Sequence, residues 1–138
     1  MLGASSFRDG QGTGMKEFSR IRTGKQGEEI AVLHLRKLGY RILERNYRCP
    51  LGEIDIVAKD GKAIVFVEVK SRKTEEFGEP EQAVGKAKQR KMSLLSLYYL
   101  AQNRRSPKDA RFDVVAVKML PSGTEVKLIR NAFDLAVG

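Results

Sequence analysis

Apolar residues recur with two different periods along the chain, and the change of period separates expected helices from expected strands. From about Gly24, apolar residues follow helical spacing as far as Leu38, and Gly39 supplies a stop. This pattern predicts a first helix. Residues 1–22 are rich in Gly, Ser and charge and have no sustained apolar period, which predicts a flexible basic N-terminal segment before a single domain over residues 23–138.

Stretches with the features of β-strands follow the first helix. Two of them flank Asp60-Gly61, a dipeptide suited to a hairpin because Gly tolerates positive φ. Residues 63–67 are apolar throughout, which predicts a central strand buried on both faces. The expected strands cover residues 40–48, 52–60, 62–72, 111–119 and 125–129.

A long second helix is predicted over residues 81–103, between the third and fourth strands. Its expected apolar side contains Leu94, Leu97, Tyr98 and Ala101. The resulting order, α-β-β-β-α-β-β, predicts an α/β fold in which a mixed sheet of about five strands is flanked by helices.

Composition narrows the class of protein. A chain of 138 residues with 41% apolar and 31% charged residues fits one soluble domain, and no apolar run is long enough to cross a bilayer. No apolar stretch follows the basic N-terminal residues as in a secretory signal. The single cysteine, Cys49, cannot form an internal disulfide and is interpreted as an incidental thiol. We therefore expect a cytoplasmic protein.

The charge balance favours an anionic partner. The chain has 26 basic and 17 acidic residues, a formal charge of +9, which attracts polyanions by long-range steering and counterion release. Nucleic acid, DNA above all, is the expected partner. Ribosomal-type binding, acidic lipid and simple solubility remain alternatives, because charge alone does not specify function.

Three ionisable residues interrupt the strands where the pattern calls for apolar ones: Asp55, Glu68 and Lys70. Side chains two positions apart project from the same face of a strand, so Glu68 and Lys70 are neighbours and Val69 points the other way. Asp55 and Glu68 lie at similar distances from the hairpin turn, so their carboxylates are expected to converge.

Two converging carboxylates suit Mg²⁺ or Mn²⁺, which are held by carboxylate oxygens, waters and substrate phosphate. Lys70 is placed to orient a water or to stabilise charge on phosphate oxygens. The structural alternative is that Glu68 and Lys70 begin the solvated end of a strand and that Asp55 pairs with a nearby Arg or Lys.

The spacing D-(x)12-E-V-K on a hairpin after a helix resembles the PD-(D/E)XK nuclease superfamily, which includes restriction enzymes and archaeal Holliday junction resolvases. From about Gly24 to Phe133 the chain is similar, more narrowly, to the bacterial YraN family. The similarity lies in GKQGE at 24–28, LGYRILERNYR at 38–48, GEIDIV at 52–57, VFVEVKSR at 65–72, the Lys88-Gln89 pair and RFDVVAV at 111–117.

The resemblance implies a restriction-endonuclease-like fold and metal-dependent hydrolysis of phosphodiester bonds in DNA, with a preference for branched or flapped structures. It places Asp55, Glu68 and Glu28 at the acidic, metal-binding positions and Lys70 at the catalytic lysine position. Ile54 stands where the nominal motif has proline. Superfamily nucleases that cut two strands often act as dimers, so the resemblance also allows a homodimer.

Two assignments stay open at this point. Glu28 and Glu29 are equally well interpreted as acids in the first turn of a helix, where they meet the macrodipole. Either Gln89 or Gln82 matches the glutamine that some relatives carry on the following helix. His34 lacks a second ligand at metal-binding spacing and receives no role.

Basic residues beside the expected site form a candidate nucleic-acid-binding surface, with a solvated helix face as its structural alternative. A non-catalytic nucleic-acid-binding protein, or an interaction module in DNA maintenance with a retained nuclease fold, is the alternative to an enzyme. The residues of this surface are Arg72, Lys73, Lys86, Lys88 and Lys91.

Overall fold

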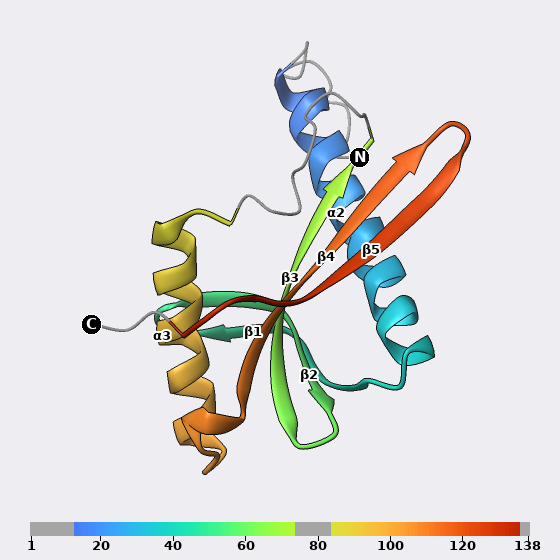
Figure 1. Ribbon diagram of the computed structural model, residues 1–138. Helices are drawn as coiled ribbons and strands as arrows, with labels where there is room; N and C mark the ends of the chain where they lie inside the picture. Colours follow the sequence, from blue (N-terminus) through green and yellow to red (C-terminus); the bar gives the residue numbers. More distant parts are fainter. Residues whose placement is uncertain (1–12, 74–83, 136–138) are drawn as a thin grey trace.

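Two helices lie on opposite faces of a five-stranded sheet in a computed structural model that describes residues 13–73 and 84–135 (Figure 1). The strand order is β1-β2-β3-β4-β5. The elements are α2 (Thr13–Lys37), β1 (Arg41–Cys49), β2 (Gly52–Asp60), β3 (Ala63–Arg72), α3 (Lys86–Gln102), the short 3-10 helix η2 (Pro107–Asp109), β4 (Ala110–Leu120) and β5 (Gly123–Phe133). This confirms the predicted element order.

The sheet is mixed because one of its four strand pairs is parallel. Adjacent strands are antiparallel except β3 and β4, whose connection contains α3. The predicted hairpin is present: Asp60 pairs with Ala63, and Gly61 has a φ of +62°. β5 runs on to Phe133, beyond the predicted end at residue 129.

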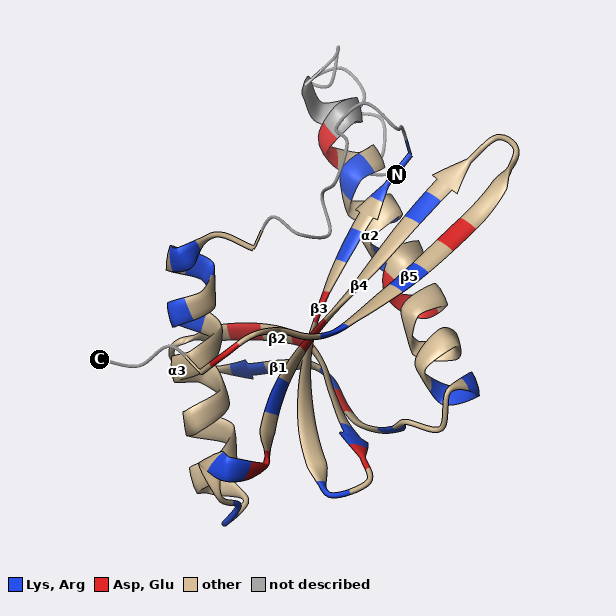
Figure 2. Cartoon of the chain, in the orientation of Figure 1, with Lys and Arg blue, Asp and Glu red and all other residues tan. Residues whose placement is uncertain are grey.

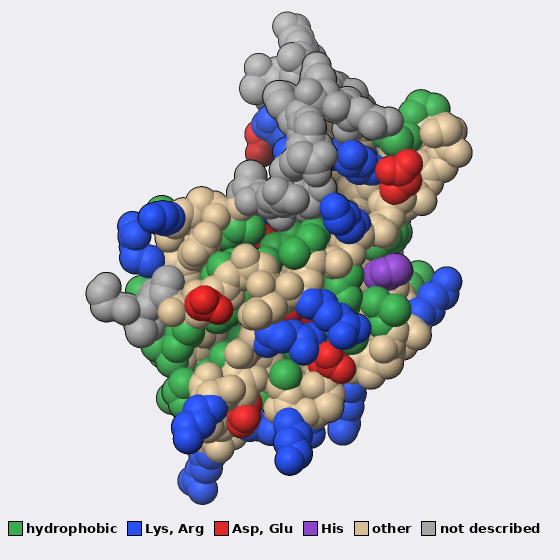
Figure 3. All heavy atoms as spheres, in the orientation of Figure 1, with side chains coloured by type: hydrophobic (Ala, Val, Ile, Leu, Met, Phe, Trp, Pro, Cys, Tyr) green, Lys and Arg blue, Asp and Glu red, His purple; other side chains and the backbone are tan. Residues whose placement is uncertain are grey.

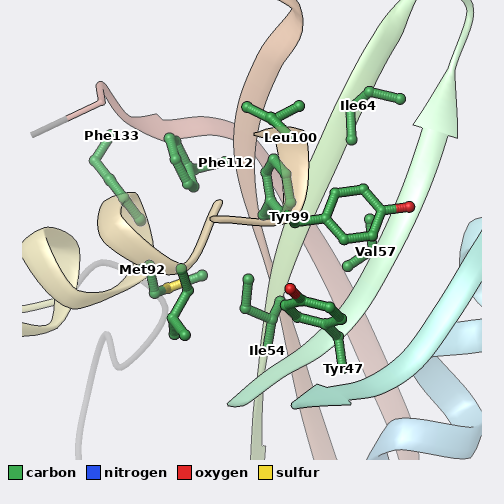
Figure 4. Close-up of a cluster of buried hydrophobic side chains, with 11 residues drawn as sticks. Tyr47, Ile54, Val57, Ile64, Met92, Tyr99, Leu100, Phe112 and Phe133 are labelled. Carbon is green, nitrogen blue, oxygen red and sulfur yellow. The ribbon is translucent and has the colours of Figure 1, made fainter. Parts of the chain in front are cut away.

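β3 is covered on both faces, as its apolar sequence predicted. Ile64 and Phe66 pack toward α3, whereas Val65 and Val67 pack toward α2. The α3-side cluster, drawn in Figure 4, contains Tyr47, Ile54, Val57, Ile64, Phe66, Met92, Leu95, Tyr99, Leu100, Phe112 and Phe133. The α2-side cluster contains Ala31, Val32, Leu35, Tyr40, Ile56, Ala58, Val65, Val67, Val115 and Val117.

Helix α2 begins at Thr13, so the expected start near Gly24 is wrong. Its C-terminal half is anchored in the α2-side cluster, and a docked helix adds further turns at little cost because nucleation has already been overcome. Phe18 and Ile21, in the added turns, are exposed. The flexibility predicted for residues 1–12 lies outside the described residues.

Helix α3 begins at Lys86, so Val84 and Gly85, which the pattern placed inside the helix, precede it; residues 81–83 lie outside the described part. The predicted apolar side is also wrong, since Leu94 is 50% exposed. Apolar residues occur all round this helix, and the side that packs on the sheet includes Ser93 and Ser96. Oγ of Ser96 donates a hydrogen bond to the Ser93 carbonyl at 2.7 Å. The small satisfied hydroxyls permit burial of the helix side formed by Met92, Ser93, Leu95, Ser96, Tyr99 and Leu100.

Neither described helix is long and apolar enough to cross a membrane.

Candidate functional site

The β2–β3 hairpin opens at Asp55. The backbone ladder between the strands ends where Ile56 pairs with Val67. Beyond this point, Oδ2 of Asp55 accepts a hydrogen bond from the Val69 N–H at 2.9 Å. Ile54 packs in the α3-side cluster but Ile56 in the α2-side cluster, although residues two apart in a regular strand share a face. The break in alternation leaves the Asp55 side chain between two diverging strands.

Asp55 and Glu68 line a common hollow of about 280 Å³ beneath the first turns of α3, here called the carboxylate hollow. Glu68 is 18% exposed. Glu53, Lys88 and Lys91 also line the hollow, and the two lysines belong to the predicted nucleic-acid-binding surface. The structure therefore brings together the two acids that the sequence singled out.

Burial raises the pKa of both acids above the ordinary value. For Glu68, the nearby Asp55 carboxylate raises the pKa further, whereas Lys88 and Lys70 lower it. For Asp55, the Val69 hydrogen bond and Lys88 oppose the effect of burial. Two desolvated carboxylates close enough to repel each other create a site that a cation would stabilise.

Two lysines act on Glu68. Nζ of Lys88 lies 3.4 Å from Oε2 of Glu68 and forms an ion pair with it. Lys70 is on the same face of β3 as Glu68, and its charge is close enough to lower the pKa of that carboxyl. Val69, between them, packs against the α2-side cluster, as alternation predicted.

Helix α2 contributes Glu28 through a close crossing with β3. A Cβ on Gly27 would lie 1.7 Å from Oγ and 2.8 Å from Cβ of Ser71, so only glycine permits this approach. Glu28 then lines a second hollow, of about 400 Å³, together with Asp55. Burial raises the pKa of Glu28, and Asp55 adds to this effect.

The helix-cap interpretation of Glu28 and Glu29 is wrong, because both lie in the middle of a helix that begins at Thr13. Glu29 instead accepts a hydrogen bond from Nη2 of Arg45 at 2.9 Å. The neighbouring acids thus have different surroundings: Glu28 faces Asp55, and Glu29 is paired and exposed.

The acids do not form a compact triad. Among the described residues, no group of three or more His, Cys, Asp or Glu side chains is close enough together to hold a metal ion. Mg²⁺ is usually held by one or two protein carboxylates, with waters and phosphate oxygens completing its shell. The pair Asp55 and Glu68 fits this requirement, whereas Glu28 lines the second hollow with Asp55 and does not line the carboxylate hollow.

Sequence patterns missed two polar residues at this end of the sheet. Glu53 lines the carboxylate hollow, and Asn46 hydrogen-bonds to Glu53 and Glu28 with its carboxamide nitrogen turned toward them. Both stand in the quoted motifs, but their roles depend on tertiary contacts. Gln89 donates to the Val84 carbonyl at 2.8 Å, which explains it as a helix-start contact, and Gln82 lies outside the described residues.

Lys and Arg residues occur on several elements, with Asp and Glu residues among them (Figure 2). Arg72 and Lys73 line the second hollow, while Lys88 and Lys91 line the first. Lys86 is exposed at the first turn of α3 and lines neither hollow. On the face drawn in Figure 3, Lys and Arg side chains are spread widely, with acidic ones between them.

Fold and site together define a small mixed α/β protein with a part-buried carboxylate pair at the open end of a β-hairpin. The model of the Uncharacterised protein family UPF0102, the YraN family, matches residues 27–117, and the chain belongs to this family.

Relatives with high sequence identity to this chain are also UPF0102 proteins. A UPF0102 protein of Syntrophus aciditrophicus is 55% identical over 118 residues, which cover 86% of this chain and 93% of the relative. One from Desulfosudis oleivorans is 50% identical over 115 residues, covering 83% and 92% respectively. One from Geobacter sulfurreducens is 47% identical over 114 residues, covering 82% and 89%.

Among solved structures, the chain is similar to Pyrococcus furiosus SfsA in complex with Ca²⁺. The TM-score is 0.37 at 16% identity, over 86% of this chain and 65% of SfsA. That likeness is too weak to bear on fold or function.

Proposed function

We propose that this protein is a metal-dependent nuclease that hydrolyses phosphodiester bonds in DNA, with branched or flapped DNA as its preferred substrate class. The observation that carries the proposal is the convergence of two part-buried acids, Asp55 and Glu68, at a strand end that also carries Lys70. A scaffold has no need to bury repelling carboxylates, whereas a cation site uses them. The preference for branched or flapped DNA rests on the resemblance to resolvase-like nucleases.

Mg²⁺ or Mn²⁺, when bound, would polarise the phosphodiester and lower the pKa of a bound water. Asp55 and Glu68 would hold the cation, and the Val69 N–H keeps the Asp55 carboxylate in place. Lys70 would orient the attacking water or stabilise charge on the phosphate oxygens.

The surrounding cations would bind the DNA backbone on both sides of the acids. Lys88 and Lys91 approach from α3, and Arg72 and Lys73 continue the end of β3. Such phosphate contacts position a nucleic acid without reading its sequence. A cation held by both carboxylates would compete with Lys88 for Glu68, so Lys88 would exchange one anionic partner for another.

The test is cleavage of labelled linear, flapped and four-way-junction DNA in Mg²⁺ or Mn²⁺, with a chelator control. Lys70→Ala and Glu68→Gln should each lower the cleavage rate by about 100-fold or more. Glu29→Gln is the matched control, because this acid sits beside Glu28 on α2 but pairs with Arg45. Cleavage that persists in Lys70→Ala and Glu68→Gln would reject the assignment and point to a contaminant.

A second candidate is non-catalytic nucleic-acid binding, and the ion pair that occupies Glu68 favours it. Phosphate contacts alone would give binding that weakens steeply with salt, with a log–log slope of about −0.9 per phosphate neutralised on duplex DNA. Tight, salt-sensitive binding with no cleavage in either metal would support this function over the first.

A further inference from the structure

Asn46 has a backbone conformation that is unusual for a residue within a strand. It lies in β1 with a φ of +53°, in the left-handed region that non-glycine residues seldom occupy. Asn tolerates this region better than most residues. Its neighbours Arg45 and Arg48 pair with Glu29 and Glu53, so this part of β1 faces acids from both α2 and β2.

The carboxamide of Asn46 joins two of those acids. With its nitrogen turned toward them, Nδ2 donates to Oε2 of Glu53 at 3.2 Å and to Oε1 of Glu28 at 3.3 Å. The opposite orientation would set the amide oxygen against carboxylate oxygens, which are acceptors only when ionised. One nitrogen with two hydrogens thus serves one carboxylate on α2 and one on β2.

The choice of a neutral donor matters here. Arg45 forms an ion pair with Glu29, whereas the group hydrogen-bonded to Glu28 is an amide, which has no charge that would compete with a metal for the carboxylate. An amide fixes the direction of a carboxylate and leaves its charge in place. Hydrogen bonds of this kind orient metal-binding side chains in many proteins.

The geometry points to Asn46 as a positioning residue that holds the Glu28 carboxylate toward Asp55, so that α2 takes part in the cation site. The inference rests on the proposed function, because it assigns Glu28 to the surroundings of the proposed metal. It also accounts for the left-handed backbone, which directs the carboxamide at Glu28 and Glu53.

The experiment measures Mn²⁺ affinity by titration of the purified full chain. Asn46→Gly removes the donors but retains a residue at ease with positive φ, and it should weaken Mn²⁺ binding by about tenfold. Asn131→Gly is the matched control: Asn131 has a φ of +52° in β5 at the other end of the sheet, and Mn²⁺ affinity should not change.

A second pair of variants tests whether Asn46 acts through Glu28. In a Glu28→Gln background, Asn46→Gly should change Mn²⁺ affinity by less than about twofold, because the acid that it orients has lost its charge. A merely structural role would lower affinity equally in both backgrounds.

Four outcomes overturn the inference: no loss in Asn46→Gly, an equal loss in Asn131→Gly, an equal loss in both Glu28 backgrounds, or no Mn²⁺ binding by the wild type. Failure of the proposed nuclease function gives a different result. In that case the wild type binds Mn²⁺ with the expected dependence on Asn46 but cleaves no DNA.

Discussion

Two aspartates lie on the strands that flank β3 and are both shielded from solvent, yet their surroundings differ. Asp113 in β4 is 0% exposed and accepts hydrogen bonds from Tyr40, Arg111 and the Asn131 N–H. Asp55 in β2 accepts a hydrogen bond from the Val69 N–H, and the carboxylate of Glu68 lies close to it. A buried acid surrounded by donors is part of the scaffold, whereas a part-buried acid with few donors is available for chemistry.

Arg111 is the cation in the hydrogen-bond network around Asp113. Nη2 of Arg111 donates to Asp113 at 3.1 Å, to the Tyr40 hydroxyl at 2.7 Å and to Asp60 at 2.9 Å. Burial alone would lower the pKa of Arg111, but the bonds to Asp113 and Asp60 more than offset this and raise it. Burial and the bond to Asp113 raise the pKa of Tyr40 to about 12. The network ties β4 to the β2–β3 turn and to the segment after α2.

The largest expected effect is on Asp113. Asp113→Ala should lower the free energy of unfolding by about 3–5 kcal/mol, because it leaves a partly buried guanidinium short of its counter-charge. Urea denaturation measures this change. Asp109→Ala, at a partly exposed acid just before the same strand, is the control and should have little effect. A small effect at Asp113 would mean that its burial is not what distinguishes the two aspartates.

Next in size is Gly27→Ala, which forces α2 away from Ser71 and should cost about 1–3 kcal/mol. Gly24→Ala, one turn earlier in the same helix, meets nothing within 4 Å and should instead stabilise the protein by roughly 0.5–1 kcal/mol. Thermal or urea unfolding of both variants gives the comparison. Equal effects at the two positions would contradict the close crossing.

A smaller effect, visible as pH dependence, is expected at Asp55. Because burial raises its pKa above the ordinary 3.8, the folded protein holds this proton more tightly than the unfolded chain. The resulting stabilisation is complete below the ordinary pKa and is lost as pH rises through the raised one. Asp55→Asn cannot ionise and should gain stability relative to the wild type over that rise, in urea titrations at a series of pH values. If the wild type gained instead, the ionised Asp55 would be satisfied in the fold as Asp113 is.

The smallest change in stability is expected at Lys88, which is 50% exposed in its ion pair with Glu68. Lys88→Ala should alter the free energy of unfolding by at most about 1 kcal/mol. It should tighten Mn²⁺ binding, since the lysine no longer competes for Glu68. Arg90→Ala, an exposed cation on the same helix, is the control. Weaker Mn²⁺ binding in Lys88→Ala would show that the lysine supports the site.

Local signals in the sequence specify the hairpin and its acids. Asp60-Gly61 and the alternation in β3 predicted the turn and placed Glu68 and Lys70 together. Asp55 interrupted an apolar strand and was recognisable for that reason.

The remaining features depend on long-range packing, which no local period records. The first turns of α2 carry little apolar pattern, and the need for glycine at position 27 is evident only from its close contact with Ser71. Glu53 and Asn46 resembled ordinary strand residues because their partners lie on other elements. The buried side of α3 was ambiguous because apolar residues surround it.

The hairpin that carries Asp55 and Glu68 also has a consequence for the order of folding. These two acids come together over a short loop, whereas the Tyr40–Asp113 bond joins residues 73 positions apart and carries a greater entropic cost of closure. During synthesis, a chain that has emerged through β3 already exposes Glu28, Asp55 and Glu68, while Asp113 has yet to emerge. The acids are therefore present on a nascent protein before the network that secures β4 can form.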